Sequence, residues 1–536
     1  AAISFGCGGD DDSDDSPGPG TGSTITAPPT ASGEAKKGGT LNMIWAVADA
    51  QLDPHTSVEH LSAEIYRAAS HGLLKQEAGT EKPIPDLATE WETPDPTTLI
   101  FHLNPAAKWQ NLPPVNGRPV TADDVVYSLK RIGTPGPAAP RASSFSAIED
   151  VIATDEHTVT IKLKEPFVPI LAALSDKWTV MVAPEVVEQN GDLKRGDIVV
   201  GCGPFICEQA ESSKGVTFVR NPDYWGTPAH LDKVIYTTIT DAEARVAAFQ
   251  SGQADISDPI PALLLNDFKK DDVDIYDFPP VSLSYGVIGG PLDRPPLNDE
   301  RARRALHLAV DRQQLGEILY PGAKFSIAGA LPHAAWGLPE AEVAKIPGFG
   351  PGVTDDQIKE ARQLLSSAGL EGAELVINTT RTYAVHHSDR AEALVPMLEK
   401  VGFAPRLNVL EYAVFKDLEA KRDFQVTVAT YAAYGDPNTP LANSFTTGAT
   451  RNYWGWSDSK YDEMIKAQQQ EMDPAKRLEM IHEIERYLLN GTPVAFDNWY
   501  MVTNVAARKK VKNYQGGYSA GSACTGWFLP QIWLDA

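Results

Sequence analysis

Cysteine, basic residues and long apolar runs are all scarce in this chain of 536 residues. No stretch approaches the roughly 18 consecutive apolar residues that a membrane span requires, so we expect none. Lysine and arginine number 47 against 71 aspartate and glutamate, and the net charge of −24 repels nucleic-acid phosphates and anionic lipid headgroups alike. A nucleic-acid partner is therefore not expected. What is present, 42% apolar and 22% charged residues, is typical of a globular protein.

The four cysteines are Cys7, Cys202, Cys207 and Cys524. Their spacing fits no zinc-binding pattern and no His-Glu-x-x-His motif occurs, so we predict neither a metal site nor a cofactor. If the protein is exported, two of the last three cysteines are expected to form a disulfide. The sequence leaves open which two pair.

The first 37 residues differ in composition from the rest. Small residues lead to Cys7, and Ala-Ala-Ile-Ser-Phe-Gly-Cys resembles the end of a bacterial lipoprotein signal peptide, although Ser4 stands where that pattern usually has leucine. From Gly8 onward Gly, Asp, Ser, Pro and Thr dominate, a composition that cannot bury a core. We expect a lipidated Cys7 and a flexible tether to residue 37. The alternative is an ordinary disordered terminus with an unmodified thiol.

Strand and helix patterns alternate along the remaining chain. Short apolar or alternating runs predict strands at residues 38–44, 97–103, 157–163, 216–220, 251–256, 285–288, 374–378 and 494–502. Helical patterns lie at residues 63–74, 125–129, 241–250 and 301–318, and capping signals start further helices at Thr354, Ser457 and Asp473. This alternation indicates the α/β class, and the length indicates two or more domains.

The most specific stretch covers residues 109–129. Trp109 is followed by the turn Asn116-Gly117, which Pro119 stiffens, and Thr121 with Asp124 three residues later forms a capping-box start for a helix. As an ordered string, these residues resemble the signature of the family 5 extracellular solute-binding proteins. That family supplies the peptide- and nickel-binding subunits of bacterial ABC importers.

Further motifs follow in the order and spacing of the same family. The stretch 201–205, Gly-Cys-Gly-Pro-Phe, departs from the family's Gly-Thr-Gly-Pro-aromatic motif only at Cys202, and residues 220–225 and 251–255 match its next two motifs. The resemblance extends from residue 38 to about 513. It implies an α/β, two-lobed periplasmic-binding-protein fold of type II, with an extra small α/β insert domain in lobe one.

The predicted domain boundaries combine these motifs with two shifts in composition, near residues 285–296 and 495. Residues 1–37 are the lipobox remnant and tether. Lobe one is expected to comprise 38–76, 198–288 and 497–536, the insert domain 77–197, and lobe two 289–496.

The resemblance implies a receptor and not an enzyme. Such a protein closes its two lobes around a small organic solute and delivers it to the transmembrane subunits of an ABC permease. We expect a monomer on the extracytoplasmic face of the bacterial membrane, held there by its N-terminal lipid alone. Nickel is disfavoured, because no histidines stand in a convincing ligand arrangement.

Candidate ligand-binding residues follow from the cleft between the lobes. Lobe one offers the end of its first strand and the loop 46–51, and lobe two offers strand ends and aromatic side chains. In dipeptide-binding members an Arg-x-Tyr at the position of residues 381–383 grips a ligand carboxylate. The candidates are Trp45, Arg381, Tyr383, Tyr431, Tyr434, Asp436, Trp454, Trp456 and Trp499.

One departure from the family narrows the ligand. Peptide binders place an aspartate four residues before the proline that is Pro437 here, and it pairs with the peptide's α-amino group. This chain has Ala433 at that position. Burying an ammonium without a counter-charge is costly, so we favour a non-standard solute, such as an oligosaccharide or another organic molecule, and keep di- and oligopeptides as the alternative.

A hydrolase is the remote alternative. Residues 517–521, Gly-Tyr-Ser-Ala-Gly, fit the Gly-x-Ser-x-Gly pattern of a nucleophilic serine. In that fold the catalytic histidine follows the serine, whereas the last histidine of this chain, His482, precedes Ser519. A glycine-rich loop explains the pattern better.

Overall fold

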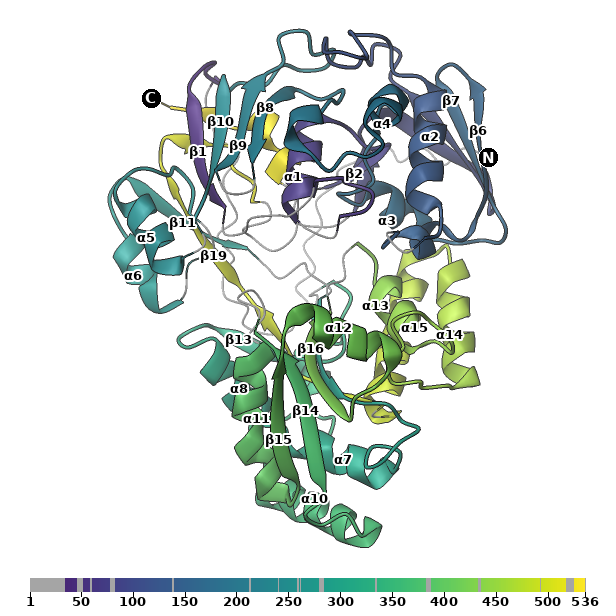
Figure 1. Ribbon diagram of the computed structural model, residues 1–536, viewed down its shortest axis with the longest axis vertical. Coiled ribbons are helices and arrows are strands. Elements are labelled where there is room, and N and C mark those ends of the chain that lie inside the picture. The colour runs from purple at the N-terminus through teal and green to yellow at the C-terminus, as the bar shows by residue number, and fades with distance from the viewer. Residues whose placement is uncertain are drawn as a thin grey trace, which may run out of the picture.

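The structure is a computed structural model. It describes residues 34–45, 52–57, 60–77, 82–136, 139–211, 214–239, 241–257, 260, 262–278, 284–332, 335–381, 387–431, 435–491, 493–516 and 525–535. Two lobes are evident, with the first described residues, in purple, in the upper lobe of Figure 1 and the middle of the chain, in green, in the lower one. The predicted sites Cys7, Tyr383, Ala433, Tyr434, Ser519 and Cys524 and the loop 46–51 lie outside the described residues.

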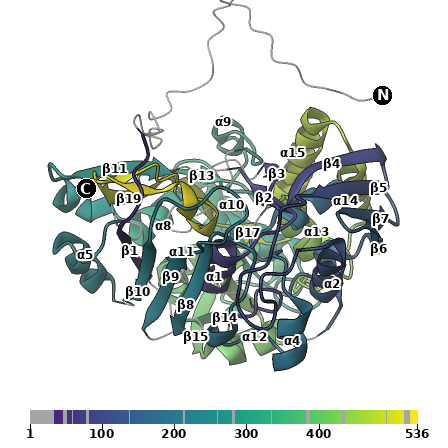
Figure 2. The same cartoon turned by 90° about the horizontal axis from the view of Figure 1, so that it is seen from above.

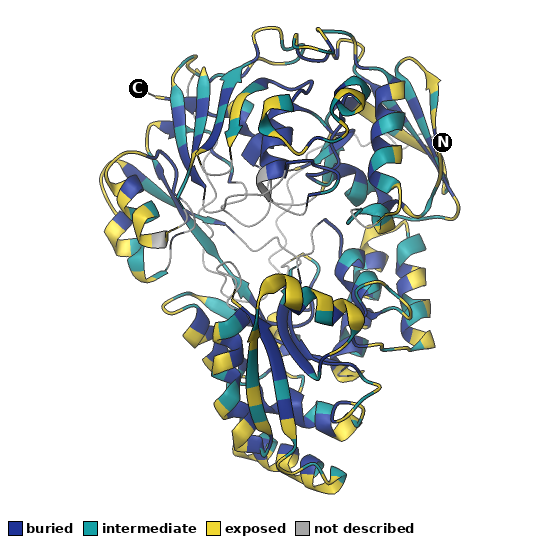
Figure 3. Ribbon diagram, viewed as in Figure 1, coloured by how far each residue is buried: buried dark blue, intermediate teal, exposed yellow. Residues whose placement is uncertain are grey.

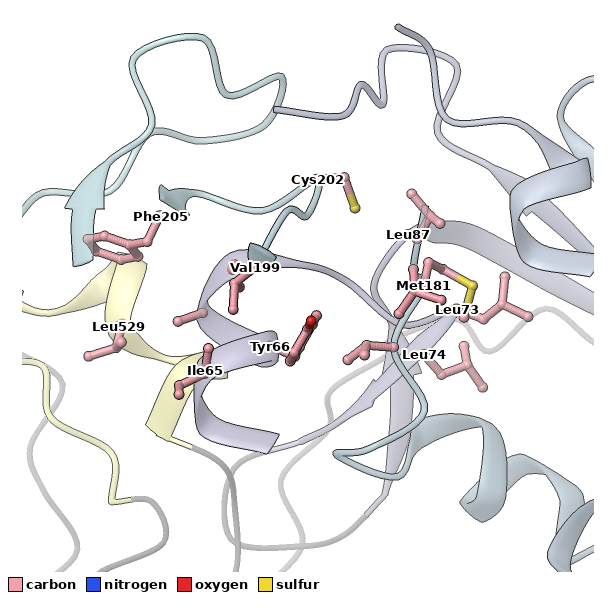
Figure 4. Close-up of a cluster of buried hydrophobic side chains, with 14 of the residues drawn as sticks. Ile65, Tyr66, Leu73, Leu74, Leu87, Met181, Val199, Cys202, Phe205 and Leu529 are labelled. Carbon is pink, nitrogen blue, oxygen red and sulfur yellow. The ribbon is translucent and has the colours of Figure 1, made fainter. Parts of the chain in front are cut away.

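Lobe one is built on a four-stranded sheet of order β1-β10-β9-β8. Its first strand pairs parallel with β10, and the two following pairings are antiparallel. The apolar run at the start of the folded chain forms β1, whose residues Leu41 and Met43 are buried in the core. Figure 4 shows Ile65 and Tyr66 of helix α1 in the same core, beside Val199 and near Phe205 and Leu529. The elements are β1 (Thr40–Trp45), α1 (His60–Ala69), β2 (Leu74–Gln76), β3 (Pro83–Pro85), β8 (Phe205–Glu211), β9 (Gly215–Arg220), β10 (Lys233–Thr238), α5 (Ala242–Gln250) and α6 (Leu265–Phe268).

The insert is an antiparallel sheet of order β4-β5-β7-β6 with helices beside it, set apart from the first sheet in Figure 2. The residues of the 109–129 signature close on one another here. Asp124 accepts hydrogen bonds from Trp109 Nε1 (3.1 Å) and from both Arg118 amino groups (2.8 and 2.7 Å), and the predicted capping box forms with Thr121. The elements are β4 (Ala88–Asp95), β5 (Thr98–Leu103), α2 (Ala122–Gly133), β6 (Ile148–Asp155), β7 (Thr158–Leu163), α3 (Ile170–Ser175) and α4 (Pro184–Asn190).

Lobe two contains a five-stranded sheet of order β15-β14-β16-β12-β17, with helices around it. Figure 3 shows the inner strands of this sheet largely buried, the edge strand β15 partly exposed and the outer helix faces exposed. The strands are β12 (Tyr285–Gly289), β13 (Phe325–Ala328), β14 (Glu374–Thr380), β15 (Ala404–Leu410), β16 (Val426–Tyr431), β17 (Ala495–Phe496) and β18 (Asn498–Met501). The helices are α7 (Glu300–Ala309), α8 (Arg312–Leu319), α9 (Glu340–Val343), α10 (Asp355–Ala368), α11 (His387–Val401), α12 (Tyr412–Lys421), α13 (Asn438–Phe445), α14 (Ser459–Gln470) and α15 (Pro474–Gly491).

The buried apolar side chains divide in the same way. One large cluster joins lobe one to the insert, and a second draws its members from residues 285–499. The chain returns from lobe two to lobe one through β19 (Thr503–Arg508), which pairs antiparallel with β11 (Val273–Phe278). Both β12 and β18 belong to sheets of lobe two, a few residues beyond the boundaries predicted at 288 and 497.

Four predicted elements differ in the structure. The helix expected at 63–74 ends at Ala69, because Gly72 passes against a backbone carbonyl where a Cβ would lie only 2.5 Å away, and β2 then begins. The helix at 301–318 is two helices, since Asp311 caps the second by accepting from Gln314 N (2.9 Å). Residues 251–256 form only isolated bridges at Ile256, and the strand at 494–502 is broken at Asp497.

The cysteines and the apolar segments bear on two further predictions. Cys202 and Cys207 are both free thiols, so they do not pair with each other. Burial raises the pKa of both thiols to about 12, and Cys202 contacts the Ser70 hydroxyl (3.6 Å). Among the residues described, no helix combines the length and apolar character that crossing a bilayer would take.

Candidate functional site

A cavity of about 170 Å³ lies where the insert faces lobe two. Its insert wall consists of the segment 140–145, helix α3 and the turn 176–179, and its lobe-two wall consists of α13 and the loop that follows it. Polar and charged side chains on both walls line it, among them Arg141, Asp176, Asp436, Asn438, Asn443 and Arg451, with Trp178 and Phe167 as aromatic members.

Arg141 is the best-defined cation of the insert wall. Its guanidinium lies 4.1 Å from the centroid of the Trp178 ring, and Nη1 donates to the carbonyl of Ser57 (2.8 Å). A carboxylate oxygen of Asp176 lies 3.9 Å from its Nε. Burial lowers the pKa of Arg141 to about 10, which still keeps it charged near neutral pH. The wall therefore presents a fixed positive charge over an aromatic face.

Lobe one reaches the same wall through the segment after β1. Asp53 is buried, receives two hydrogen bonds from Arg131 of α2 (2.9 and 2.5 Å), and accepts from the backbone of Leu193 (3.2 Å). His55 is also buried, its Nε2 lies 2.9 Å from the Val180 carbonyl oxygen, and burial lowers its pKa to about 3. These contacts hold the segment 52–57, which follows the first strand, against the insert.

On the opposite wall, Asp436 is held by Arg477 of α15. Two hydrogen bonds of 2.7 and 2.6 Å join the guanidinium to both carboxylate oxygens, and the two side chains are 6% and 7% exposed. Arg477 also donates to the side-chain oxygen of Gln468 (3.0 Å). The carboxylate that lines the cavity thus already has its counter-charge.

The same wall touches the insert directly. The backbone amide of Val168 donates to the carbonyl of Gln469 (2.8 Å), the last turn of α14. Next to it, Gln470 Nε2 donates to Glu165 (3.2 Å), and Lys466 lies 3.4 Å from the same carboxylate. The insert and lobe two are therefore in contact beside the cavity.

The aromatic candidates gather in lobe two, packed mainly against one another. Tyr431 is buried, donates to Glu419 (2.5 Å), and lies 6.2 Å from Trp454 between ring centroids. Burial raises its pKa well above the ordinary value, and Glu419 adds to the effect. Trp454 has no exposed surface, and Trp456 packs on Tyr461 at 4.8 Å. None of these rings lines the cavity.

The other candidates are spread over both lobes. Trp45 is 4% exposed at the end of β1 and packs edge-on against Tyr236 at 6.0 Å. Trp499 lies in β18 and donates to the carbonyl of Arg312 (2.9 Å). Arg381 is exposed immediately after β14. Of the seven predicted residues that lie within the described part of the chain, Asp436 alone lines the cavity.

Sequence reasoning missed Arg141, Trp178 and Asn443. Arg141 follows the run Gly-Thr-Pro-Gly-Pro-Ala-Ala-Pro, which is typical of a linker, and nothing near it marks a binding residue. Asn443 sits in the middle of α13, where only the docking of the insert gives it a role. Among the described residues, no group of three His, Cys, Asp or Glu side chains could hold a metal ion.

Comparisons with known proteins place this geometry in context. The sequence model described as "Bacterial extracellular solute-binding proteins, family 5 Middle" matches residues 82–452. The dipeptide-binding protein of Escherichia coli (strain K12) is 24% identical over 470 residues, which cover 82% of this chain and 85% of the relative. The periplasmic oligopeptide-binding protein OppA of Salmonella typhimurium is 26% identical over 515 residues, 90% of each chain.

Solved structures show the fold. The periplasmic binding protein DppA from Helicobacter pylori, in complex with the peptide STSA, aligns with a TM-score of 0.78 and 20% identity over 94% of this chain and 99% of its own. The binding protein AgaA from A. tumefaciens R10, in complex with agropinic acid, aligns with a TM-score of 0.76 and 23% identity over 93% and 99%. The predicted α/β, two-lobed periplasmic-binding-protein fold is confirmed.

Proposed function

Because the chain belongs to family 5 of the bacterial extracellular solute-binding proteins, we propose that its ligand is a small organic acid recognised by its carboxylate and not by an ammonium group. The chain is an extracytoplasmic solute-binding protein of ABC import, a class that captures and releases a solute without converting it. The open question is which solute the cleft selects.

The observation that carries the proposal is the ion pair between Asp436 and Arg477. The charge of a carboxylate held by two short hydrogen bonds to a guanidinium is already compensated, so this carboxylate gains less from pairing with a ligand ammonium than an unpaired one would. The neighbouring position of the peptide-binding pattern is Ala433, which carries no charge. The insert wall meanwhile presents Arg141 over Trp178, an arrangement suited to a carboxylate on a partly apolar body.

A relative supports the choice of ligand class. The structurally similar AgaA was solved with agropinic acid, and MoaA, 22% identical with a TM-score of 0.74, with mannopinic acid. Those two complexes show that this fold accommodates organic acids other than peptides. An oligosaccharide is not proposed, because two of the aromatic candidates whose faces could stack on a sugar, Tyr431 and Trp454, are packed inside lobe two.

Calorimetry with matched ligands tests the proposal. The panel comprises a short peptide, its N-acetyl form, its C-terminal amide, and agropinic acid. We expect acetylation to change the Kd by less than about threefold and amidation to raise it by about tenfold or more, since only the carboxylate forms a charge-assisted hydrogen bond. The opposite order, with acetylation abolishing binding, would show that the protein is a standard peptide receptor.

A standard peptide receptor is the second candidate, and one residue favours it. Asp176 lines the cavity, is 19% exposed, and lies 3.9 Å from Arg141. Its carboxylate is therefore less tightly paired than that of Asp436, the other carboxylate in the lining. If Asp176 anchors a peptide amine, Asp176→Asn will weaken binding of the free peptide and spare the acetylated one. Under our proposal the variant leaves the ratio of the two affinities unchanged.

The lipid anchor at Cys7 and the delivery of the solute to ABC permease subunits are also proposed. Cys7 is preceded by small residues and followed by the acidic, glycine-rich segment 8–37, a composition that suits a tether. Expressed with its signal peptide in a bacterial host, the protein is expected to partition into Triton X-114. Cys7→Ser should move it to the aqueous phase; equal partitioning of both forms contradicts the anchor.

A further inference from the structure

A second pocket, of about 600 Å³, lies in lobe one. It is enclosed by the end of α1, strand β2, the turn 224–227 and the C-terminal segment 526–533. No residue that lines it also lines the cavity between the insert and lobe two. Its volume falls within the range of about 300 to 1,000 Å³ that small-molecule sites occupy.

Aromatic rings form much of its lining. Trp225, Trp527 and Trp533 come from separate segments of the chain and meet around the same space. Trp225 is held in place by a hydrogen bond from its Nε1 to the Cys202 carbonyl (2.8 Å), and it packs against Tyr224 at 5.2 Å between ring centroids. Such walls are suited to a planar or apolar ligand body.

One cation in the lining of this pocket, Lys75, is not part of an ion pair within the described part of the chain, whereas the carboxylate of Asp86 is. Asp86 is 3.2 Å from Arg67 Nη1 and 2.7 Å from His71 Nδ1, and it accepts from the amide of Gly72 (2.9 Å). Burial raises the pKa of Asp86, but His71, Lys75 and Arg67 outweigh it and hold the pKa at about 2. Asp86 is thus ionised and already matched. Lys75 lines the pocket without an ion-pair partner among the described residues.

One buried donor of the lining is unused. Trp527 is 5% exposed, yet its Nε1 has no hydrogen-bond partner in the part of the chain that the structure describes. The guanidinium of Arg67, which also lines the pocket, lies 5.0 Å from the centroid of its ring. A buried indole N–H without an acceptor is unfavourable unless a ligand or water supplies one.

From these three observations we propose that lobe one carries a second binding site, for a small aromatic carboxylic acid. The ring lies among Trp225, Trp527 and Trp533, the carboxylate pairs with Lys75, and the Trp527 indole N–H is free to donate to a ligand oxygen. The site is separate from the solute cleft, and its occupancy does not depend on which solute the cleft selects.

Arg67 connects the two sites. Besides stacking on Trp527, its guanidinium donates to the carbonyls of Asp176 (2.5 Å), Lys177 (3.0 Å) and Thr179 (3.2 Å), which form the turn on the insert wall of the solute cavity. A substitution of Arg67 would therefore disturb both places. Lys75, whose side chain is only partly buried, is the better residue to change.

The test uses indole-3-acetate and its amide as probes of the full chain, followed by calorimetry and by saturation-transfer NMR. We expect the acid to bind saturably and about tenfold more tightly than the amide, the effect of one charge-assisted hydrogen bond. Lys75→Gln should remove that preference and leave the amide affinity as it was. Lys194→Gln, an exposed lysine paired with Asp192, is the matched control and should change neither.

Four outcomes overturn the proposal. The acid and the amide could bind the wild-type protein equally, no saturable binding could occur up to about 10 mM, or Lys75→Gln could keep the preference. A crystal of the complex locates the probe; its density between the insert and lobe two instead of beside Trp527 likewise refutes a second site. Cleft binding, measured with the peptide and organic-acid panel, should be equal in Lys75→Gln and the wild type.

Discussion

Replacing Arg477 with methionine is expected to lower the free energy of unfolding by about 3 to 5 kcal/mol, the usual cost of breaking a buried ion pair from one side. Asp436 would keep its charge inside the protein with its guanidinium partner gone, since both side chains are at most 7% exposed. Urea unfolding monitored by tryptophan fluorescence, compared at equal pH with the wild type, measures the loss.

Two further variants sharpen this experiment. Arg486→Met removes a similar pair with Glu342, whose side chains are 35% and 36% exposed, and it should cost no more than about 1 kcal/mol. Asp436→Asn combined with Arg477→Met removes both charges and should recover much of the loss. If Arg477→Met costs no more than Arg486→Met, the ion pair does not stabilise this wall, and Asp436 would be available to a ligand after all.

Asp124→Ala is the second substitution with a large expected effect, about 3 to 4 kcal/mol. The carboxylate accepts from Trp109, from both amino groups of Arg118 and from the backbone amide of Thr121 (3.0 Å). Its removal leaves the buried indole N–H and the amide without this acceptor, and Arg118 keeps Glu185 as its remaining carboxylate partner. The change should also raise amide hydrogen exchange in the first turns of α2, which loses its capping box.

The neighbouring residue provides the control. Asp123 lies in the same first turn of α2 but is exposed, and Asp123→Ala removes only a favourable charge near the helix N-terminus. We expect a cost of about 0.3 to 1 kcal/mol. Equal losses for the two variants would mean that Asp124 acts through the helix dipole alone and that its bonds to Trp109 and Arg118 contribute nothing measurable.

The elements that the sequence predicted correctly are those whose signals are local. The capping boxes at Thr121 and Thr354 both form, because a hydroxyl and a carboxylate or amide three residues apart need only their own turn to meet. The prediction of a single helix at 301–318 was wrong, because the structure has two helices there. The periodicity predicts Asp311 inside this helix, but aspartate also suits an N-cap position. In the structure Asp311 is the N-cap of α8.

The site was harder to predict because its geometry depends on distant partners. Nothing near Asp436 in the sequence shows that Arg477, 41 residues later, takes up its charge. Likewise Arg141 gains its position from Trp178 and from Ser57, which lie in other elements. The aromatic residues Tyr431 and Trp454 pack against each other in the structure. Their positions in the sequence do not distinguish a ring that packs in the core from one that contacts a ligand.

The carboxylate of Asp124 has a consequence for how the 109–129 signature varies among sequences. Trp109 and Arg118 both donate hydrogen bonds to Asp124. A substitution at any one of the three positions therefore removes a hydrogen-bond partner from this group. We expect the three to be replaced together or kept together across homologues, whatever solute each one carries. A chain that retains only one of them should have rebuilt the start of this helix by other means.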